Sequence, residues 1–397
     1  MNAEGDTQFR RLDAWIESMI ADGKMANAQT TVFKSGATIH SHRAGVMDIA
    51  GDEPLREDAI FRIYSMTKPV TAVAMMTLVE DGTCDLDDPL AKFIPAFAET
   101  QVYHSGDIDD YKAEPPKTPF TIRHLLTHTG GLTYANQQVE PVATLYRNGK
   151  VDFSAARDDF AAAVDTVAGL PLIFHPGERW HYSISHDVMG RLIELISGQS
   201  FDRYLRERIF EPLRMLDTGF RIPAENHHRL PAIYGYDKQG QLKDISNYSA
   251  DRFLRGGTLL SGGGGLVSTT ADYLRFARML LHRGELDDAR ILREETVSHM
   301  TRNELDGDLP SMGALEDGGD SMAGIGFGLI GAIMLDPAQS VFSGSTGDFC
   351  WGGAASTYFW VDPKEDMAVV FMTQLMPPRA LPTRREVRRH VYDALRT

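Results

Sequence analysis

Segments that favour β-strands gather near the two ends of this chain, and the stretch between them is mainly helical. Apolar patterning predicts strands at 28–33, 37–46, 326–335, 355–361 and 367–374. It also predicts a helix beside each group, over 9–21 and 383–395. This order implies an α+β fold, with an antiparallel sheet flanked by N- and C-terminal helices and a large, mainly helical domain inserted into it.

The length of 397 residues suits two or three domains. We expect a discontinuous sheet domain, formed by 1–64 and 325–397, and a mainly helical domain at 65–324. The active site is expected at the seam, because ligand sites often lie between domains. Two long loop-like segments, 95–119 and 221–258, are candidates for walls or lids of that site.

Charge and composition exclude several classes of protein. The formal net charge is -15 and no Lys/Arg cluster occurs, which argues against nucleic-acid binding. The two cysteines, Cys84 and Cys350, form no metal-ligand spacing. The acidic N-terminus lacks the apolar core of a secretory signal, and the longest apolar run, 325–335, is too short to span a bilayer. We therefore expect a cytoplasmic protein without a membrane partner.

The first chemical motif is Ser65-Met66-Thr67-Lys68, followed by Pro69. Proline is tolerated only in the first turn of a helix, so the helix is expected to begin at Ser65 or Met66. Lys68 then lies on the same face as Ser65. The pair offers a nucleophilic hydroxyl and an amine to activate it, with the Ser65 N–H as an oxyanion donor. S-x-x-K is common by chance, however, and a serine at a helix start is usually a cap.

Two further motifs complete a candidate site. Tyr182 stands at a loop-to-helix junction, and an ammonium beside a phenol favours its ionised form. Together with Lys68 it could act as the general base for Ser65. Trp351-Gly352-Gly353-Ala354 opens a predicted strand, which as an edge strand could offer the Ala354 N–H as a second oxyanion donor. Taken separately, each motif is better explained without catalysis, Tyr182 as a half-buried tyrosine with its hydroxyl bonded and the glycine stretch as an ordinary turn.

In this order, the three motifs resemble those of the serine β-lactamase-like superfamily. Further similar stretches lie at 122–132, 175–182 and 262–269. Within the superfamily, the chain most resembles the family VIII carboxylesterases, which share the fold of class C β-lactamases and penicillin-binding proteins. The resemblance implies that Ser65 is acylated, that Lys68 and Tyr182 form the base system, and that Trp351-Gly352-Gly353 replaces the K-T-G strand. It also implies short acyl chains and no cofactor or metal.

Two departures from the lactamase pattern favour a neutral ester. Ile184 stands where the tyrosine motif has Asn, and Trp351 replaces the Lys that would bind a carboxylate. We therefore expect a serine carboxylesterase acting on a small-molecule ester, with a homo-oligomer left open. The alternatives are a β-lactamase or D-amino-acid peptidase of the same fold, and a catalytically silent binding protein. No G-x-S-x-G motif supports an α/β-hydrolase.

Other residues are weaker candidates. Tyr134, Phe253 and Phe349 are possible substrate-binding walls that the motifs do not fix. His124 and His128 have i, i+4 spacing but lack the Glu of a zinc-protease helix, so a structural role is expected. The run Gly262–Gly265 lacks the Lys-Ser/Thr of a P-loop and predicts a tight loop.

Overall fold

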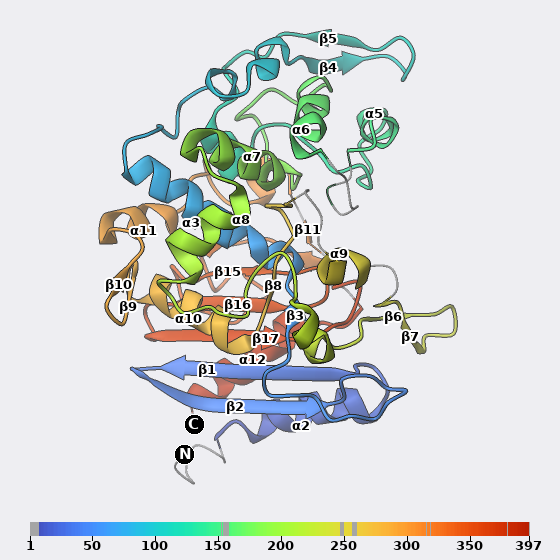
Figure 1. Ribbon diagram of the computed structural model, residues 1–397, viewed down its shortest axis with the longest axis vertical. Coiled ribbons are helices and arrows are strands. Elements are labelled where there is room, and N and C mark those ends of the chain that lie inside the picture. The colour runs from blue at the N-terminus through green and yellow to red at the C-terminus, as the bar shows by residue number, and fades with distance from the viewer. Residues whose placement is uncertain are drawn as a thin grey trace.

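The computed structural model describes residues 8–151, 153, 159–246, 250–255, 260–314, 316–317, 319–378 and 380–396. It contains an antiparallel sheet of seven strands with a helical part above it (Figure 1). The predicted α+β fold is confirmed. The first residues, on which the expectation about a secretory signal rests, lie outside this described part.

Both ends of the chain contribute strands to the one sheet. The strand order is β13-β14-β15-β16-β17-β1-β2. Strand β1 pairs with β17, so that Gln29 lies opposite Met372 and Lys34 opposite Met367. The bounds are β1 Asn27–Lys34, β2 Ala37–Gly45, β13 Ile325–Phe327, β14 Ala332–Met334, β15 Phe349–Gly352, β16 Tyr358–Asp362 and β17 Met367–Met372.

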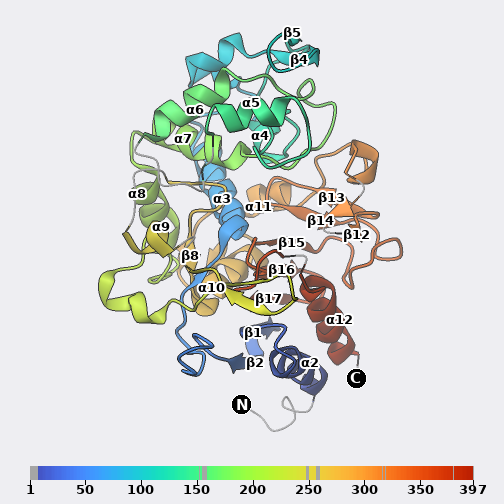
Figure 2. The same cartoon turned by 90° about the vertical axis from the view of Figure 1, so that its right-hand side faces the viewer.

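Helices cover both faces of the sheet, which explains why its central strands are apolar on both sides. Alternate residues of a strand point to opposite faces. In β17, Val370 joins the core that includes α10 (Thr270–Leu281), whereas Val369 joins the core formed with α2 (Arg10–Ala21) and α12 (Thr383–Leu395). Helices α2 and α12 lie side by side against the sheet (Figure 2).

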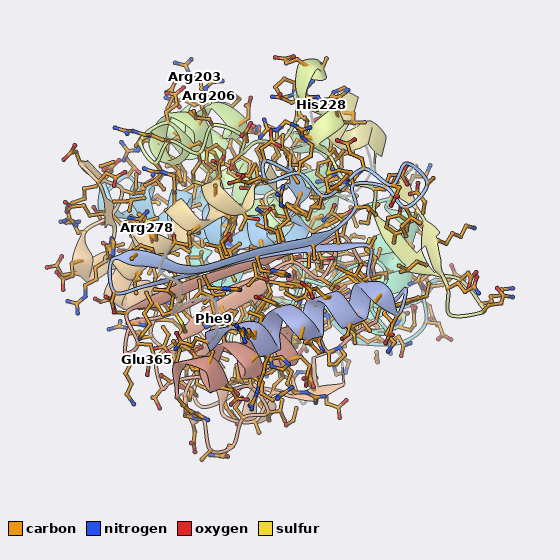
Figure 3. All side chains as sticks on the ribbon, turned by 90° about the horizontal axis from the view of Figure 1, so that it is seen from below. Phe9, Arg203, Arg206, His228, Arg278 and Glu365 are labelled. Atoms are coloured by element: carbon orange, nitrogen blue, oxygen red, sulfur yellow. The ribbon has the colours of Figure 1, made fainter. Side chains whose placement is uncertain are left out.

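The view from below shows how these helices are fastened to the sheet. Phe9, just before α2, stacks on His40 of β2 with ring centroids 4.5 Å apart (Figure 3). On the other face, the Arg278 guanidinium of α10 lies 4.3 Å from the ring centroid of Phe33. His228, labelled in the same view, is an exposed side chain of the short 3₁₀ helix Ala224–Arg229.

Helix α3 (Thr67–Glu80) is the centre of the helical part. Its residues from Thr67 to Leu78 are buried, and it packs against α7 (Ser185–Ser197). A helix that is apolar all round is one enclosed by its neighbours. The other helices are α4 Ile122–Leu126, α5 Val142–Asn148, α6 Phe160–Ala168, α8 Phe201–Leu205, α9 Ala250–Arg255 and α11 Glu294–Met300. No helix in the described ranges is long and apolar enough to cross a membrane.

Several predicted elements differ from the structure. The single strand predicted at 326–335 is a hairpin, β13 and β14, because the apolar run turns at Gly328–Gly331. The sequence over 153–170 also predicts a helix, but α6 begins at Phe160, and 154–158 lie outside the described residues.

The two segments predicted to be loop-like contain short strands. The segment 95–119 holds β4 (Val102–Ser105) and β5 (Lys112–Glu114). The segment 221–258 holds β6 (Tyr234–Tyr236) and β7 (Leu242–Asp244), although part of it is outside the described residues. Helix α10, which falls within the helical range 65–324, packs on the sheet. The division into two domains stays a prediction.

Candidate active site

The chain enters Ser65 through a sharp change of direction. Strand β3 (Phe61–Arg62) pairs with β8 (Val267–Ser268), and a single 3₁₀ turn over Tyr64–Met66 then leads into α3. Tyr64 has φ +42°, a left-handed conformation that is uncommon for a residue with a side chain. The turn closes through the Met66 N–H, which donates to the Ile63 carbonyl over 3.0 Å. Ser65 therefore lies at the N-terminal end of the helical stretch, close to the predicted start.

Lys68 is buried directly beside the serine. Its Nζ donates to Ser65 Oγ (3.3 Å), to the hydroxyl of Tyr134 (3.0 Å) and to the carbonyl of Gly263 (2.7 Å). An ammonium has three donors, so these three acceptors match its capacity. The contact with Ser65 is the one expected from the i, i+3 spacing, whereas the other two acceptors come from distant parts of the chain.

Tyr182 contacts the same serine from the segment that precedes α7. It lies just before α7, and its hydroxyl is hydrogen-bonded to Ser65 Oγ over 2.7 Å. The Lys68 Nζ lies 4.6 Å from the centroid of the Tyr182 ring, a cation–π contact. The structure thus brings Ser65, Lys68 and Tyr182 together, with the lysine against the ring of the tyrosine rather than bonded to its hydroxyl.

The ring of His128 packs against the ring of Tyr182. Their ring centroids are 4.9 Å apart, and His128 Nδ1 accepts a hydrogen bond from the Ser183 N–H over 3.3 Å. Burial holds the pKa of His128 well below its usual range, so this ring is neutral and adds no charge under the tyrosine. His124 instead closes a capping box with Thr121 at the start of α4. Neither histidine belongs to a group of metal ligands among the described residues.

Trp351 forms an aromatic wall beside Tyr182. Its ring centroid lies 5.5 Å from that of Tyr182 and 5.3 Å from that of Phe327. Trp351 and Gly352 end β15, whereas they were expected to open a strand. Nor is β15 an edge strand of the sheet, because β14 lies beside it. However, β14 pairs only as far as Cys350, so Trp351 and Gly352 are paired on one side alone.

Gly353 brings the end of β15 against the chain that leads to Ser65. Its N–H donates to the Thr357 carbonyl over 2.8 Å, which closes the turn into β16. A Cβ at this position would lie 2.4 Å from the Ile63 carbonyl oxygen. Only glycine fits so close an approach. Since the Gly353 N–H is already bonded, the next amide of the turn, that of Ala354, stays the predicted oxyanion donor.

The three weaker candidates have different outcomes. Tyr134 joins the site through its hydrogen bond to Lys68. Phe253 is 0% exposed and packs edge-on against Tyr64, and Phe349 is 1% exposed within the main core. A side chain without accessible surface offers no wall to a substrate, so these two phenylalanines do not line the site in this structure.

Three residues of the site were not among the sequence candidates. Gly263 accepts from Lys68, and its own N–H donates to the buried carboxylate of Asp187 over 3.1 Å. Asp187 also accepts from the Ser261 hydroxyl over 2.5 Å. The signal in the sequence was the glycine run, because a Cβ on Gly263 would lie 2.4 Å from Asp187 Oδ2. The predicted tight loop therefore contacts two helices, α3 through Lys68 and α7 through Asp187.

Comparison with known proteins places this geometry in a family. The family model described as Beta-lactamase matches residues 12–393. Protein Rv1367c from Mycobacterium tuberculosis (strain ATCC 25618 / H37Rv) is 33% identical over 382 residues, covering 95% of this chain and 91% of the relative. Esterase EstB from Burkholderia gladioli is 28% identical over 378 residues, covering 91% of this chain and 89% of the relative.

A solved structure has the same fold. EstCE1, described as a hydrolase with promiscuous acyltransferase activity, superposes with a TM-score of 0.83 at 22% sequence identity. The superposition covers 98% of this chain and 100% of EstCE1. These matches confirm the superfamily that the three motifs resemble, and the chain belongs to the Beta-lactamase family.

Proposed function

We propose that this protein is a serine carboxylesterase that hydrolyses esters of short acyl chains through an acyl-enzyme on Ser65. The observation that carries the proposal is the position of Ser65 Oγ, 2.7 Å from the Tyr182 hydroxyl and 3.3 Å from Lys68 Nζ. A hydroxyl held between a phenol and an amine is a nucleophile with its base in place. Similarity to Esterase EstB over most of the chain supports the same activity.

The reaction follows from these contacts. The Lys68 ammonium, against the ring of Tyr182, stabilises the phenolate, which takes the proton from Ser65 Oγ. Ser65 Oγ attacks the ester carbonyl carbon, and the N–H groups of Ser65 and Ala354 hold the oxyanion. Collapse of the tetrahedral intermediate releases the alcohol, which takes the proton from Tyr182. Water then attacks the acyl-enzyme with Tyr182 again as the base, and the carboxylic acid leaves.

The aromatic wall supports a neutral ester over an anionic lactam or peptide. Trp351 stands where the resemblance places the carboxylate-binding Lys, and it packs with Phe327. Phe327 in turn contacts Trp180, with ring centroids 5.4 Å apart. An indole provides apolar surface and no positive charge, so a substrate carboxylate would gain no ion pair there. A β-lactamase or D-amino-acid peptidase stays the alternative, and a silent binding protein is the third.

One comparison separates these functions. Wild type and Ser65→Ala are assayed on p-nitrophenyl butyrate and on a chromogenic cephalosporin, with Ser41→Ala, an exposed serine of β2, as the matched control. The proposal requires ester turnover that Ser65→Ala abolishes and Ser41→Ala keeps. Lactam turnover rivalling ester turnover would support the alternative. No turnover and no labelling of Ser65 by a fluorophosphonate would leave a silent binding protein.

Acyl-chain preference is tested in the same assay. A series of p-nitrophenyl esters from acetate to palmitate should show kcat/KM falling beyond butyrate or hexanoate. An increase toward palmitate would contradict the short-chain preference. The cytoplasmic location and a homo-oligomeric state are further proposals, which cell fractionation and light scattering of the purified protein can test.

A further inference from the structure

Asp187 is a buried carboxylate at the start of the helix that follows Tyr182. It is 1% exposed, in the first turn of α7. Its Oδ1 accepts hydrogen bonds from the Ser261 hydroxyl (2.5 Å) and from the Gly263 N–H (3.1 Å). Burial raises the pKa of the Asp187 carboxyl, while the positive charge of Lys68 and the two hydrogen bonds act against that rise. None of the reaction steps above uses this group.

Gly263 links Asp187 to Lys68. Its N–H is bonded to the carboxylate, and its carbonyl accepts from the Lys68 ammonium over 2.7 Å. The same loop is fixed to α3 at two further points. The Thr71 hydroxyl donates to the Gly262 carbonyl over 2.8 Å, and the Leu266 N–H donates to the Thr67 hydroxyl over 3.1 Å. The Gly263 carbonyl, which accepts the hydrogen bond from Lys68, is therefore held in place by contacts of the residues before and after it in the loop.

The charges around this link make Asp187 the candidate for the anion that balances Lys68. Lys68 is 2% exposed, and a buried cation is strongly destabilised without a paired anion. Burial keeps His128 and His186 neutral, with pKa values well below the usual range, so neither adds a charge. Tyr134 and Tyr182 contact the ammonium, and Arg252 also contributes positive charge near the carboxylate.

We propose that Asp187 is a positioning residue for the reaction. Its carboxylate orients Lys68 through Ser261 and Gly263, and its negative charge balances the buried ammonium. This inference rests on the proposed function, since it assigns a role within the same site. The physical consequence is electrostatic. Removing the negative charge of Asp187 disfavours the ammonium form of Lys68, so the pH above which kcat/KM falls should be lower, by on the order of one pH unit.

The test is the pH dependence of Asp187→Asn. An Asn carbonyl can still accept from Ser261 and Gly263, so the change removes mainly the charge. We expect kcat/KM for p-nitrophenyl butyrate to fall at least tenfold at pH 7, with the alkaline limb of its pH profile about one pH unit lower. The loss should lie in kcat rather than KM.

Two variants serve as controls. Asp362→Asn neutralises a buried carboxylate at the far end of β16, where it accepts from the Tyr392 hydroxyl, and should leave kcat/KM and the pH profile unchanged. Ser261→Ala removes one hydrogen bond and keeps the charge. It should lower kcat a few-fold without moving the pH profile.

The outcomes distinguish this inference from the proposed function. A wild type without ester turnover and without fluorophosphonate labelling of Ser65 overturns both. An active wild type whose folded Asp187→Asn variant keeps the same pH profile overturns only the role of Asp187. If that variant does not fold, Ser261→Ala decides, because an unchanged kcat would show that the carboxylate's contacts do not position Lys68.

Discussion

Adding one methyl group at Gly353 should disable the site, whereas the same change at Gly352 should not. A Cβ on Gly353 would lie 2.2 Å from the Thr357 hydroxyl and 2.4 Å from the Ile63 carbonyl oxygen. Real Cβ atoms are essentially never found closer than 3.0 Å to such an atom. The hydroxyl can rotate away, but the carbonyl is backbone. Either Ile63 or the turn after β15 must therefore move by at least about 0.6 Å.

That movement would displace both the nucleophile Ser65 and the proposed oxyanion donor Ala354. Ile63 is two residues before Ser65, and its carbonyl accepts the hydrogen bond that closes the 3₁₀ turn. Gly353 precedes Ala354, the proposed oxyanion donor. Misplacing catalytic groups by about 1 Å costs about 100-fold in rate, and overpacking costs about 1–3 kcal/mol of stability. We expect kcat/KM of Gly353→Ala to fall about 100-fold while the protein still folds.

Gly352→Ala is the matched control. The three atoms nearest its Cβ would be those of the Arg384 guanidinium, at 2.7–2.8 Å, which is the far end of a flexible side chain and can shift. Steady-state kinetics on p-nitrophenyl butyrate, with thermal unfolding followed by circular dichroism, compares the two variants. The reasoning fails if folded Gly353→Ala keeps kcat/KM within threefold of wild type, or if Gly352→Ala loses as much.

Three further outcomes are expected. Burial lowers the pKa of His124 and His181 to about 4. The contribution of these two neutral rings to stability is therefore complete above pH 6.5 and is lost as pH falls toward 4. At low pH each of these histidines lowers the free energy of unfolding by about 3 kcal/mol. His181→Gln should therefore lose less stability than wild type between pH 7.5 and pH 4.5, as measured by urea unfolding. Burial raises the pKa of Asp272 to about 6. The stability that its protonated carboxyl allows is full at low pH and is lost as pH rises through 6. Asp272→Asn should therefore gain stability over wild type by up to about 3 kcal/mol at pH 8 but not at pH 4, and equal gains at both would contradict this. Tyr134→Phe removes one acceptor of Lys68 and should lower kcat about fivefold, from a hydrogen bond worth about 1 kcal/mol; an unchanged kcat would show that this hydroxyl is dispensable.

Local patterns predicted the elements whose signals are local. Apolar residues recur at helical spacing between clear ends over 185–197 and 383–395, which predicts two helices, and α7 and α12 have these bounds. Strand β15 was missed, since two of the four residues around its end are glycines and its apolar part is short. The hairpin of β13 and β14 was predicted as one strand because its turn lies inside an apolar run.

The residues of the site likewise divide into those that local motifs mark and those that only contacts between distant segments bring in. Ser65, Lys68 and Tyr182 were identified because ordered motifs mark them, and Ile184 and Trp351 are substitutions within those motifs. Asp187 lies outside those motifs, and Gly263 lies in a glycine run that by itself predicted only a tight loop. The contact between Lys68 and Gly263 joins positions 195 residues apart in the chain, and no local pattern encodes such a distance. The burial of Phe253 and Phe349 likewise depends on what packs over them.

The pairing of β1 with β17 has a consequence for how the protein is made. A ribosome completes β1 more than 300 residues before β17, so the sheet stays open until residue 372 has emerged. Until then the hairpin of β1 and β2 exposes an unpaired strand edge, the kind of surface that promotes misassembly. Residues 349–354 also emerge late, so a nascent chain carries Ser65, Lys68 and Tyr182 well before the turn at Gly353. Activity should therefore arise only after the turn at Gly353 has emerged and β17 has paired with β1. Slow folding is expected because pairing of such distant segments closes a very long loop.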